Sequence, residues 1–166
     1  MPSKHSNFIF RVAIVLMLVF ISSCGGAPSD SETAPESSSG VIAKNSSYSS
    51  PIAISDDDSL IVVANTLNST VSLINVAGDA NTKLTEVQVG EEPRSVVITP
   101  NKAFAYVTNQ VSGTVSVIDL NSQTKVTDIT VGAEPYGIAL TPDGTRAYVA
   151  NSASNTVSII DTTTNT

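Results

Sequence analysis

The sequence lacks most of the side chains on which enzyme chemistry usually depends. It contains no tryptophan, one cysteine, Cys24, and one histidine, His5, and the last two both lie near the N-terminus. No disulfide can form within one chain, and no histidine remains once an N-terminal leader is removed. A Ser-His-Asp triad, thiolate or imidazole metal sites and a His-ligated haem are therefore excluded from the mature chain. We accordingly expect neither a metal nor another cofactor.

Basic and aromatic residues are also scarce. The chain has 8 Lys and Arg against 15 Asp and Glu, a net charge of −7. Phosphate binding needs clustered Lys and Arg, so we expect no nucleic-acid partner and interpret the acidic balance as a solubilising surface. Hydrophobic residues make up 41% of the chain but aromatics only 5%. The expected core therefore consists of Val, Ile, Ala, Ser and Thr, which suits closely stacked sheets.

The N-terminal segment has the pattern of an export signal. Basic residues up to Arg11 precede the apolar run Val12–Ile21, which is too short to span a membrane comfortably and has the length of a signal-peptide core. The following Ile21-Ser22-Ser23-Cys24 resembles a bacterial lipobox, in which an aliphatic and two small residues precede the cysteine that receives diacylglycerol. We predict a signal peptide over residues 1–23 and lipidation at Cys24. An ordinary leader with a chance cysteine, or a short uncleaved anchor, is the alternative.

A polar segment follows the cysteine. Residues 25–40, GGAPSDSETAPESSSG, contain Gly, Ser, Pro and acidic residues with nothing to bury, which is typical of a flexible tether. Gly25 rather than Asp follows Cys24, and by resemblance to lipoprotein sorting this implies the outer membrane. We therefore expect an exported lipoprotein at the outer membrane or cell surface, with residues 24–40 as lipidated cysteine and tether.

The rest of the chain is organised around a unit that occurs three times, at residues 52–75, 96–119 and 138–161. Asn65, Asn109 and Asn151 correspond, at spacings of 44 and 42 residues, and each precedes Thr-Val-Ser by five residues. Turn residues divide each copy into four short runs, with no helical periodicity, which predicts an antiparallel meander. The predicted strands are 52–54, 60–64, a third from 70, and 84–89; then 96–99, 104–108, a third from 114, and 126–131; then 138–141, 147–150 and a third from 156.

Several motifs in these copies carry a family resemblance. Tyr106-Val107-Thr108-Asn109 is the YVTN signature, and residues 62–65 and 148–151 are variants of it. With Thr-Pro-Asp-Gly at 141–144 and Val-Gly-Ala-Glu-Pro at 131–135, residues 41–166 resemble the YVTN family of β-propeller repeats. The resemblance implies an all-β propeller of four-stranded blades, with about three blades present as a partial ring and the first strand of each blade innermost.

Complete members of that family have about seven blades, so three leave two apolar blade faces open. Either the sequence is a fragment of a longer chain, or copies self-associate into a ring. Residues 41–44 lie where a preceding fourth strand is expected, and they could pair with a terminal blade. We therefore expect isolated residues 41–166 to aggregate, stay partly unfolded or assemble.

Two repeated features are interpreted as structural. The turn Asp56-Asp57-Asp58 lacks the glycine and distal glutamate of a calcium loop, and the other copies have Pro-Asn-Lys and Pro-Asp-Gly there, which favours a solvated turn. The repeated Asn65, Asn109 and Asn151 stand at strand exits, where we expect hydrogen bonds to neighbouring loop backbone.

Ligand contacts are predicted at the links between copies, which by resemblance lie near the mouth of the central channel. These links contain Glu92 and Arg94, then Glu134 and Tyr136, and Arg94 and Tyr136 are equivalent positions with different chemistry. The alternative is an Arg paired with a local Glu and a Tyr packed on a rim.

The sequence as a whole favours a non-enzymatic, lipid-anchored binding or scaffolding module of the cell envelope. Its predicted partners are the membrane, through the lipid, and a protein or glycan ligand. The alternatives are a fragment of a lactonase-like propeller hydrolase, which would use carboxylates, and a truncated product without function.

Overall fold

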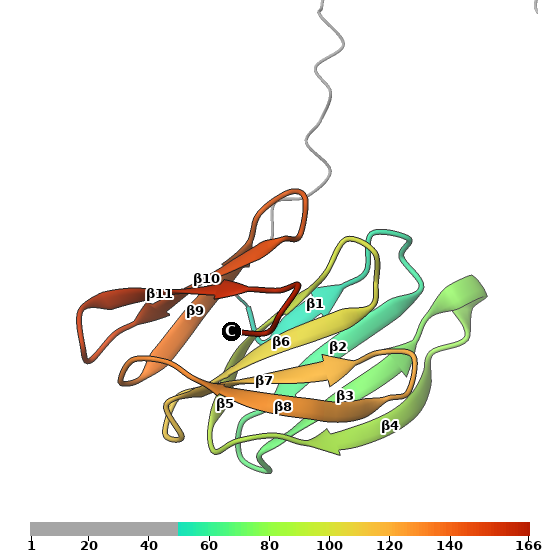
Figure 1. Cartoon of the computed structure of the whole chain (residues 1–166). Helices are drawn as coiled ribbons and strands as arrows, with labels where there is room; N and C mark the ends of the chain where they lie inside the picture. The colour runs from blue at the N-terminus through green and yellow to red at the C-terminus, as the bar shows by residue number, and fades with distance from the viewer. Residues whose placement is uncertain (1–49) are drawn as a thin grey trace, which may run out of the picture. The chain divides into compact units, whose positions relative to one another are not determined.

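The computed structural model describes residues 50–166, and these form three antiparallel β-sheets that follow one another along the chain (Figure 1). Strands that are consecutive in sequence are neighbours in each sheet. We call the sheets blades 1 to 3. Blade 1 comprises β1 (Ile52–Ile54), β2 (Leu60–Asn65), β3 (Thr70–Asn75) and β4 (Thr82–Gln88); blade 2 comprises β5 (Pro93–Ile98), β6 (Phe104–Asn109), β7 (Thr114–Asp119) and β8 (Thr124–Thr130); blade 3 comprises β9 (Pro135–Leu140), β10 (Arg146–Asn151) and β11 (Thr156–Asp161). The predicted fold class, an all-β partial propeller of about three blades, is confirmed.

The first strands of the three blades lie side by side. The strand β5 contacts β1 on one side and β9 on the other. Just before β1, the carbonyl oxygen of Ser50 accepts a hydrogen bond from the backbone N–H of Val96 in β5, at 2.9 Å. This arrangement agrees with the expectation that the first strand of each blade is innermost.

The turn between the first two strands of each blade is built by one repeated hydrogen bond. A hydroxyl donates to the side-chain oxygen two residues later, from Ser55 to Asp57 at 2.6 Å and from Thr141 to Asp143 at 2.5 Å, and Thr99 does the same in blade 2. The next residue has a left-handed φ, 53° at Asp58 and 71° at Gly144. These local bonds explain why Asp and Asn recur in the turns.

The ends of several strands differ from the prediction. The strands β5 and β9 begin three residues before the predicted positions, at Pro93 and Pro135. The reason is that the link before each of them already pairs with the second strand of the blade, β6 or β10. The strands β4 and β8 begin two residues early and end one residue early. A short 3-10 turn, η1 (Ala77–Asp79), lies between β3 and β4. Proline at the first residue of a strand removes no hydrogen bond from the interior of the ladder.

Two apolar clusters hold the blades together, one at each junction. The cluster between blades 1 and 2 includes Val62, Leu73, Val96 and Ile118. The cluster between blades 2 and 3 centres on Tyr106, which has no exposed surface. The small β-branched core is as predicted, but the sequence did not predict that an aromatic side chain would be its largest fully buried member.

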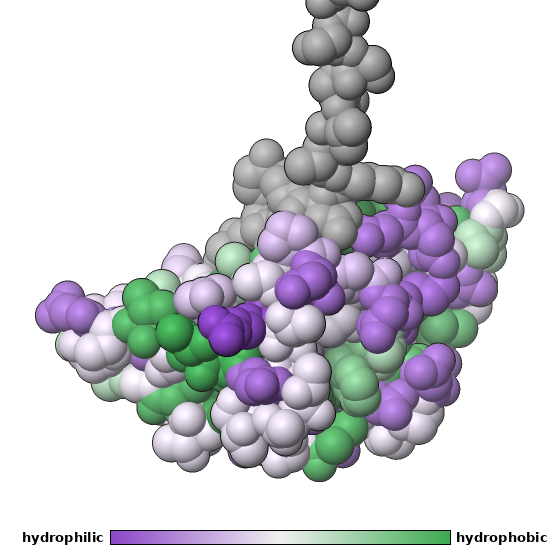
Figure 2. All heavy atoms as spheres, turned by 45° about the horizontal axis from the view of Figure 1, so that its top comes forward, coloured by the Kyte–Doolittle hydropathy of each residue, from purple (hydrophilic) through white to green (hydrophobic). Residues whose placement is uncertain are grey.

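The face of blade 3 that points away from blade 2 carries exposed apolar side chains. They are Tyr148, Val157 and Ile159, with exposed fractions of 38%, 63% and 58%. Hydrophobic surface gathers at the left of Figure 2, over the sheet of β9 to β11.

Several predictions fall on residues 1–49, which lie outside the described residues. They are the signal peptide, lipidation of Cys24, the tether up to residue 40 and the extra strand at residues 41–44. Within residues 50–166, no helix has the length and apolar character to cross a membrane.

Candidate functional site

The predicted ligand contacts lie at the links that lead into the inner strands. Glu92 and Glu134 directly precede β5 and β9, and both have left-handed backbone conformations, with φ of 54° and 51°. The carbonyl of Glu92 accepts from the backbone N–H of Gln110, and that of Glu134 from the N–H of Ser152, both at 2.9 Å. The two glutamates are thus held in the same way, each against the end of the second strand of its own blade, β6 or β10.

Arg94 is the centre of the side-chain contacts at these links. Its guanidinium donates to Glu92 Oε2 at 2.8 Å, and its Nε donates to Gln110 Oε1. The Cζ atom also lies 6.0 Å from the ring centroid of Tyr136. The structure therefore brings Glu92, Arg94 and Tyr136 together, including the pairing of Arg94 with a local glutamate that the alternative expected. Because both charged side chains are about one third to one half exposed, their ion pair contributes at most about 1 kcal/mol.

A shallow, open hollow of about 590 Å³ lies beside this cluster. It is lined by Glu92, Gln110, Val111, Gly113, Ala133 and Glu134. It therefore combines residues of two consecutive links with the loop between β6 and β7. Two carboxylates, an amide and the neighbouring guanidinium can all hydrogen-bond a small molecule rich in oxygen. Ligand binding by the four predicted residues stays a prediction.

Ala133 of the second link was not among the predicted site residues, and neither were three residues of the loop between β6 and β7, namely Gln110, Val111 and Gly113. They follow the repeated asparagine of blade 2, and position 110 is Thr66 in blade 1 and Ser152 in blade 3. This difference between copies is the same signal that selected Arg94 and Tyr136. It was missed because the loop is far in sequence from the link that it faces.

The repeated asparagines bond within their own blades. The amide of Asn109 donates to Thr114 Oγ1 at 3.0 Å and to Ser116 Oγ at 2.9 Å. Asn65 and Asn151 make the equivalent pairs of bonds. Their partners are thus hydroxyls of the next strand, whereas the sequence led us to expect loop backbone. Each asparagine is the last residue of β2, β6 or β10 and pairs directly with the threonine that begins the following strand. Its side-chain amide therefore lies next to the hydroxyls of that strand.

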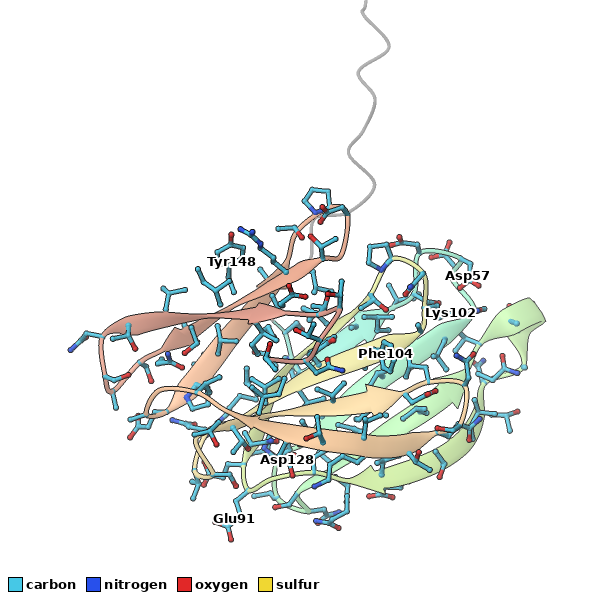
Figure 3. All side chains as sticks on the ribbon, viewed as in Figure 1. Asp57, Glu91, Lys102, Phe104, Asp128 and Tyr148 are labelled. Carbon is cyan, nitrogen blue, oxygen red and sulfur yellow. The ribbon has the colours of Figure 1, made fainter. Side chains whose placement is uncertain are left out.

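The acidic turn of blade 1 has a neighbour that the sequence did not reveal. Asp57 pairs with Lys102 of blade 2 at 2.5 Å, and Figure 3 shows the two side chains together. The hydrogen bonds from Lys102, Ser55 and Ser59 lower the pKa of the Asp57 carboxyl far below its usual range. The pair of Asp57 and Lys102 therefore links two blades at their exposed turns. Within residues 50–166, no group of three or more His, Cys, Asp or Glu side chains could hold a metal ion.

The chain resembles solved structures of known propellers. It is 32% identical to a chain of hydrazine synthase from Kuenenia stuttgartiensis, with a TM-score of 0.65 over 76% of this chain and 36% of that one. It is 19% identical to a candidate 6-phosphogluconolactonase from Bacteroides fragilis, with a TM-score of 0.62 over 69% of this chain and 35% of that one. This chain thus spans about a third of the length of these two proteins. No protein with a curated description matches it.

A family model covers more than half of the sequence. The model of the lactonase family of seven-bladed β-propellers matches residues 25–130, which include blades 1 and 2. The three sheets, their meander order and the buried junctions are those of a propeller. The chain therefore belongs to the lactonase family of seven-bladed β-propellers.

Proposed function

We propose that this chain forms part of a lactonase-type propeller and that the hollow beside Arg94 binds and hydrolyses small cyclic esters. Family membership supports the substrate class. The observation that carries the proposal is that Glu92, Glu134 and Gln110 line one hollow with Arg94 beside it. This reverses the order of preference that the sequence favoured, because the family and the candidate 6-phosphogluconolactonase both support the lactonase alternative.

The residues of the hollow match the needs of ester hydrolysis. The oxygen of a water molecule bonds to the carbonyl carbon, the ring C–O bond breaks, and a proton passes from the water to the ring oxygen to give a hydroxy acid. Glu134 is the proposed base that carries this proton, because its carboxylate has one long contact, 3.5 Å from Ser152 Oγ. Arg94 offsets the negative charge that develops on the carbonyl oxygen, and Glu92 orients the guanidinium.

The proposal predicts measurable lactone hydrolysis by the full chain. We expect δ-gluconolactone or its 6-phosphate to release acid faster with the protein than without it in a pH-stat. Glu134→Gln should lower the catalysed rate by about 100-fold or more, since a positioned base typically contributes that much. Glu91→Gln is the control, because Glu91 lies in the preceding link, beside Glu92, but does not line the hollow. A rate equal to that of the uncatalysed reaction would overturn the proposal.

A binding module is the second candidate function, and the side-chain contacts of Arg94 favour it. Its guanidinium already contacts Glu92, Gln110 and Tyr136, so it can serve as a fixed recognition surface for a glycan or protein. No histidine follows His5 in the sequence to share proton transfer. Saturable lactone or sugar binding in calorimetry, without acid release, would support this candidate over the hydrolase.

We also propose that the protein is anchored by lipid at Cys24 and exported to the outer membrane or cell surface. Support comes from the apolar run Val12–Ile21, the small residues Ser22 and Ser23, and the polar segment that follows. A single acyl chain gives only marginal membrane binding, so stable anchoring needs the several chains of a bacterial lipoprotein.

Labelling with a fatty-acid analogue tests the anchor. We expect the wild-type chain to be labelled in cells and Cys24→Ser to lose the label completely, because the thiol is the acceptor. Ser22→Ala is the control, since alanine keeps a small side chain beside the cleavage site. Undiminished labelling of Cys24→Ser would rule out this anchor.

A further inference from the structure

The hollow beside Arg94 presents mainly hydrogen-bond acceptors. It is lined by Glu92 and Glu134, whose carboxylates accept hydrogen bonds and donate none. Gln110 adds an amide, but Oε1 of this amide accepts a bond from Arg94 Nε, so the NH2 group is the part left to contact a ligand. The remaining lining residues have apolar side chains or none. A ligand that fills the hollow must therefore offer several hydrogen-bond donors.

The two links that form this region are also negatively charged. They contain three glutamates, Glu91, Glu92 and Glu134, and one arginine, Arg94, which is a net formal charge of −2. Glu92 Oε2 lies 2.8 Å from the guanidinium of Arg94 and offsets its charge. A phosphate group on a ligand would compete with Glu92 for this guanidinium and would be repelled by the other carboxylates.

The other cationic side chains of residues 50–166 lie at the opposite end of the strands. Lys102 is in the turn between β5 and β6, Arg146 begins β10, and Lys83 and Lys125 stand near the start of β4 and β8. Because consecutive strands are antiparallel, these positions are at the ends of the strands away from the links. Figure 3 shows Glu91 and Lys102 at opposite ends of the blades. None of these four cations lines the hollow.

We infer that the hollow takes uncharged, hydroxyl-rich rings and rejects their phosphate esters. Together with the proposed function, on which this step rests, the inference names unphosphorylated sugar lactones as the substrate class. Ring hydroxyls can donate to the carboxylates and accept from the amide of Gln110. A phosphate dianion brings further acceptors and negative charge, and both are mismatched to this lining. All lining residues lie between positions 92 and 134, away from both ends of the described chain.

Calorimetry on the full chain tests the preference without requiring a reaction. Glucose and glucose 6-phosphate are the probes, because they share one ring, contain no lactone and differ by the phosphate group. We expect glucose to bind at least about tenfold more tightly at low salt, since like charges oppose the second complex. The difference should shrink at about 0.5 M salt, where charges are screened more strongly. Equal or tighter binding of glucose 6-phosphate, or no binding of either sugar, would overturn the inference.

A charge reversal in the first link separates electrostatic repulsion from the shape of the hollow. Glu91→Lys changes the charge of the link but not the lining residues, so it should strengthen binding of glucose 6-phosphate by at least about threefold and leave glucose unchanged. Asp79→Lys is the matched control, because it makes the same change of charge in η1, at the opposite end of the strands. An equal gain with Asp79→Lys would contradict the assignment of the preference to the links.

Hydrolysis distinguishes this inference from the proposed reaction. In a pH-stat, kcat/KM for δ-gluconolactone should exceed that for its 6-phosphate by at least about tenfold at low salt. Comparable hydrolysis of the 6-phosphate would overturn the inference and leave the proposed reaction standing. Preferential binding of glucose without hydrolysis of either lactone would overturn the proposed reaction and support the uncharged ligand class for a binding module.

Discussion

Replacement of Tyr106 by alanine is expected to lower the free energy of unfolding by about 4 kcal/mol, as is typical for a large buried aromatic side chain. Tyr106 is fully buried among Val115, Val117 and Ile138 at the junction of blades 2 and 3. Its removal leaves a cavity and also removes the hydrogen bond to Asn165. Burial and the charge of Asp161 raise the pKa of Tyr106 to about 12, so the hydroxyl remains a donor at neutral pH.

Tyr148 provides the matched control, because it occupies the same position of the following repeat. It is 38% exposed, so Tyr148→Ala should cost less than about 1 kcal/mol. Tyr106→Phe keeps the packing and should lose about 1 kcal/mol for the hydroxyl alone. Urea unfolding followed by circular dichroism measures all three. Equal losses at Tyr106 and Tyr148 would contradict the burial of Tyr106 and the exposure of Tyr148.

This pair shows why burial could not be predicted from the local sequence. Tyr106-Val107 and Tyr148-Val149 are identical dipeptides in equivalent strands. Their local sequence predicts the same strand and the same alternation of faces, and the structure confirms this. Whether the face that carries this tyrosine is covered depends on a neighbouring blade about 40 residues away in the sequence. Local pattern thus predicts which residues share a face, but it does not show what packs on that face.

Some features of the candidate site could likewise be predicted from the sequence, and others could not. Arg94 and Tyr136 could be predicted because the repeat aligns them and their chemistry differs between copies. The proximity of these two side chains could not be predicted, because it depends on how closely β5 and β9 of adjacent blades approach each other. The sequence gives no measure of that distance. Gln110 was missed because it follows β6 and lies 16 residues from Arg94 in the sequence, although the pairing of β5 with β6 brings the two side chains together. The spacing of the repeats therefore predicts equivalent positions within blades better than contacts between strands.

The second large effect is expected at Gly132, in the link that follows β8, the fourth strand of blade 2. Gly132→Ala should destabilise the protein by about 3 kcal/mol, because an added Cβ would lie 2.5 Å from Asn151 Nδ2 and 2.6 Å from Ser154 Oγ. Asn151 is 2% exposed and donates to Thr156 and Ser158. It can yield space only by giving up these bonds inside the structure. Gly78→Ala is the control, because no atom lies within 4 Å of its added Cβ and only the left-handed φ of 57° costs stability, by about 1 kcal/mol.

A double-mutant cycle separates this steric cause from a general intolerance of the link. Asn151→Ala alone removes the two bonds and should also destabilise, but it opens the space that the alanine at position 132 needs. The two losses should therefore not add, and the double variant is expected to be more stable than their sum by at least about 1 kcal/mol. Gly90 faces Asn109 in the same way, with contacts of 2.8 Å, so the cycle can be repeated there. Strict additivity at both sites in thermal unfolding would show that the glycines are required for another reason than the space taken by the repeated asparagine.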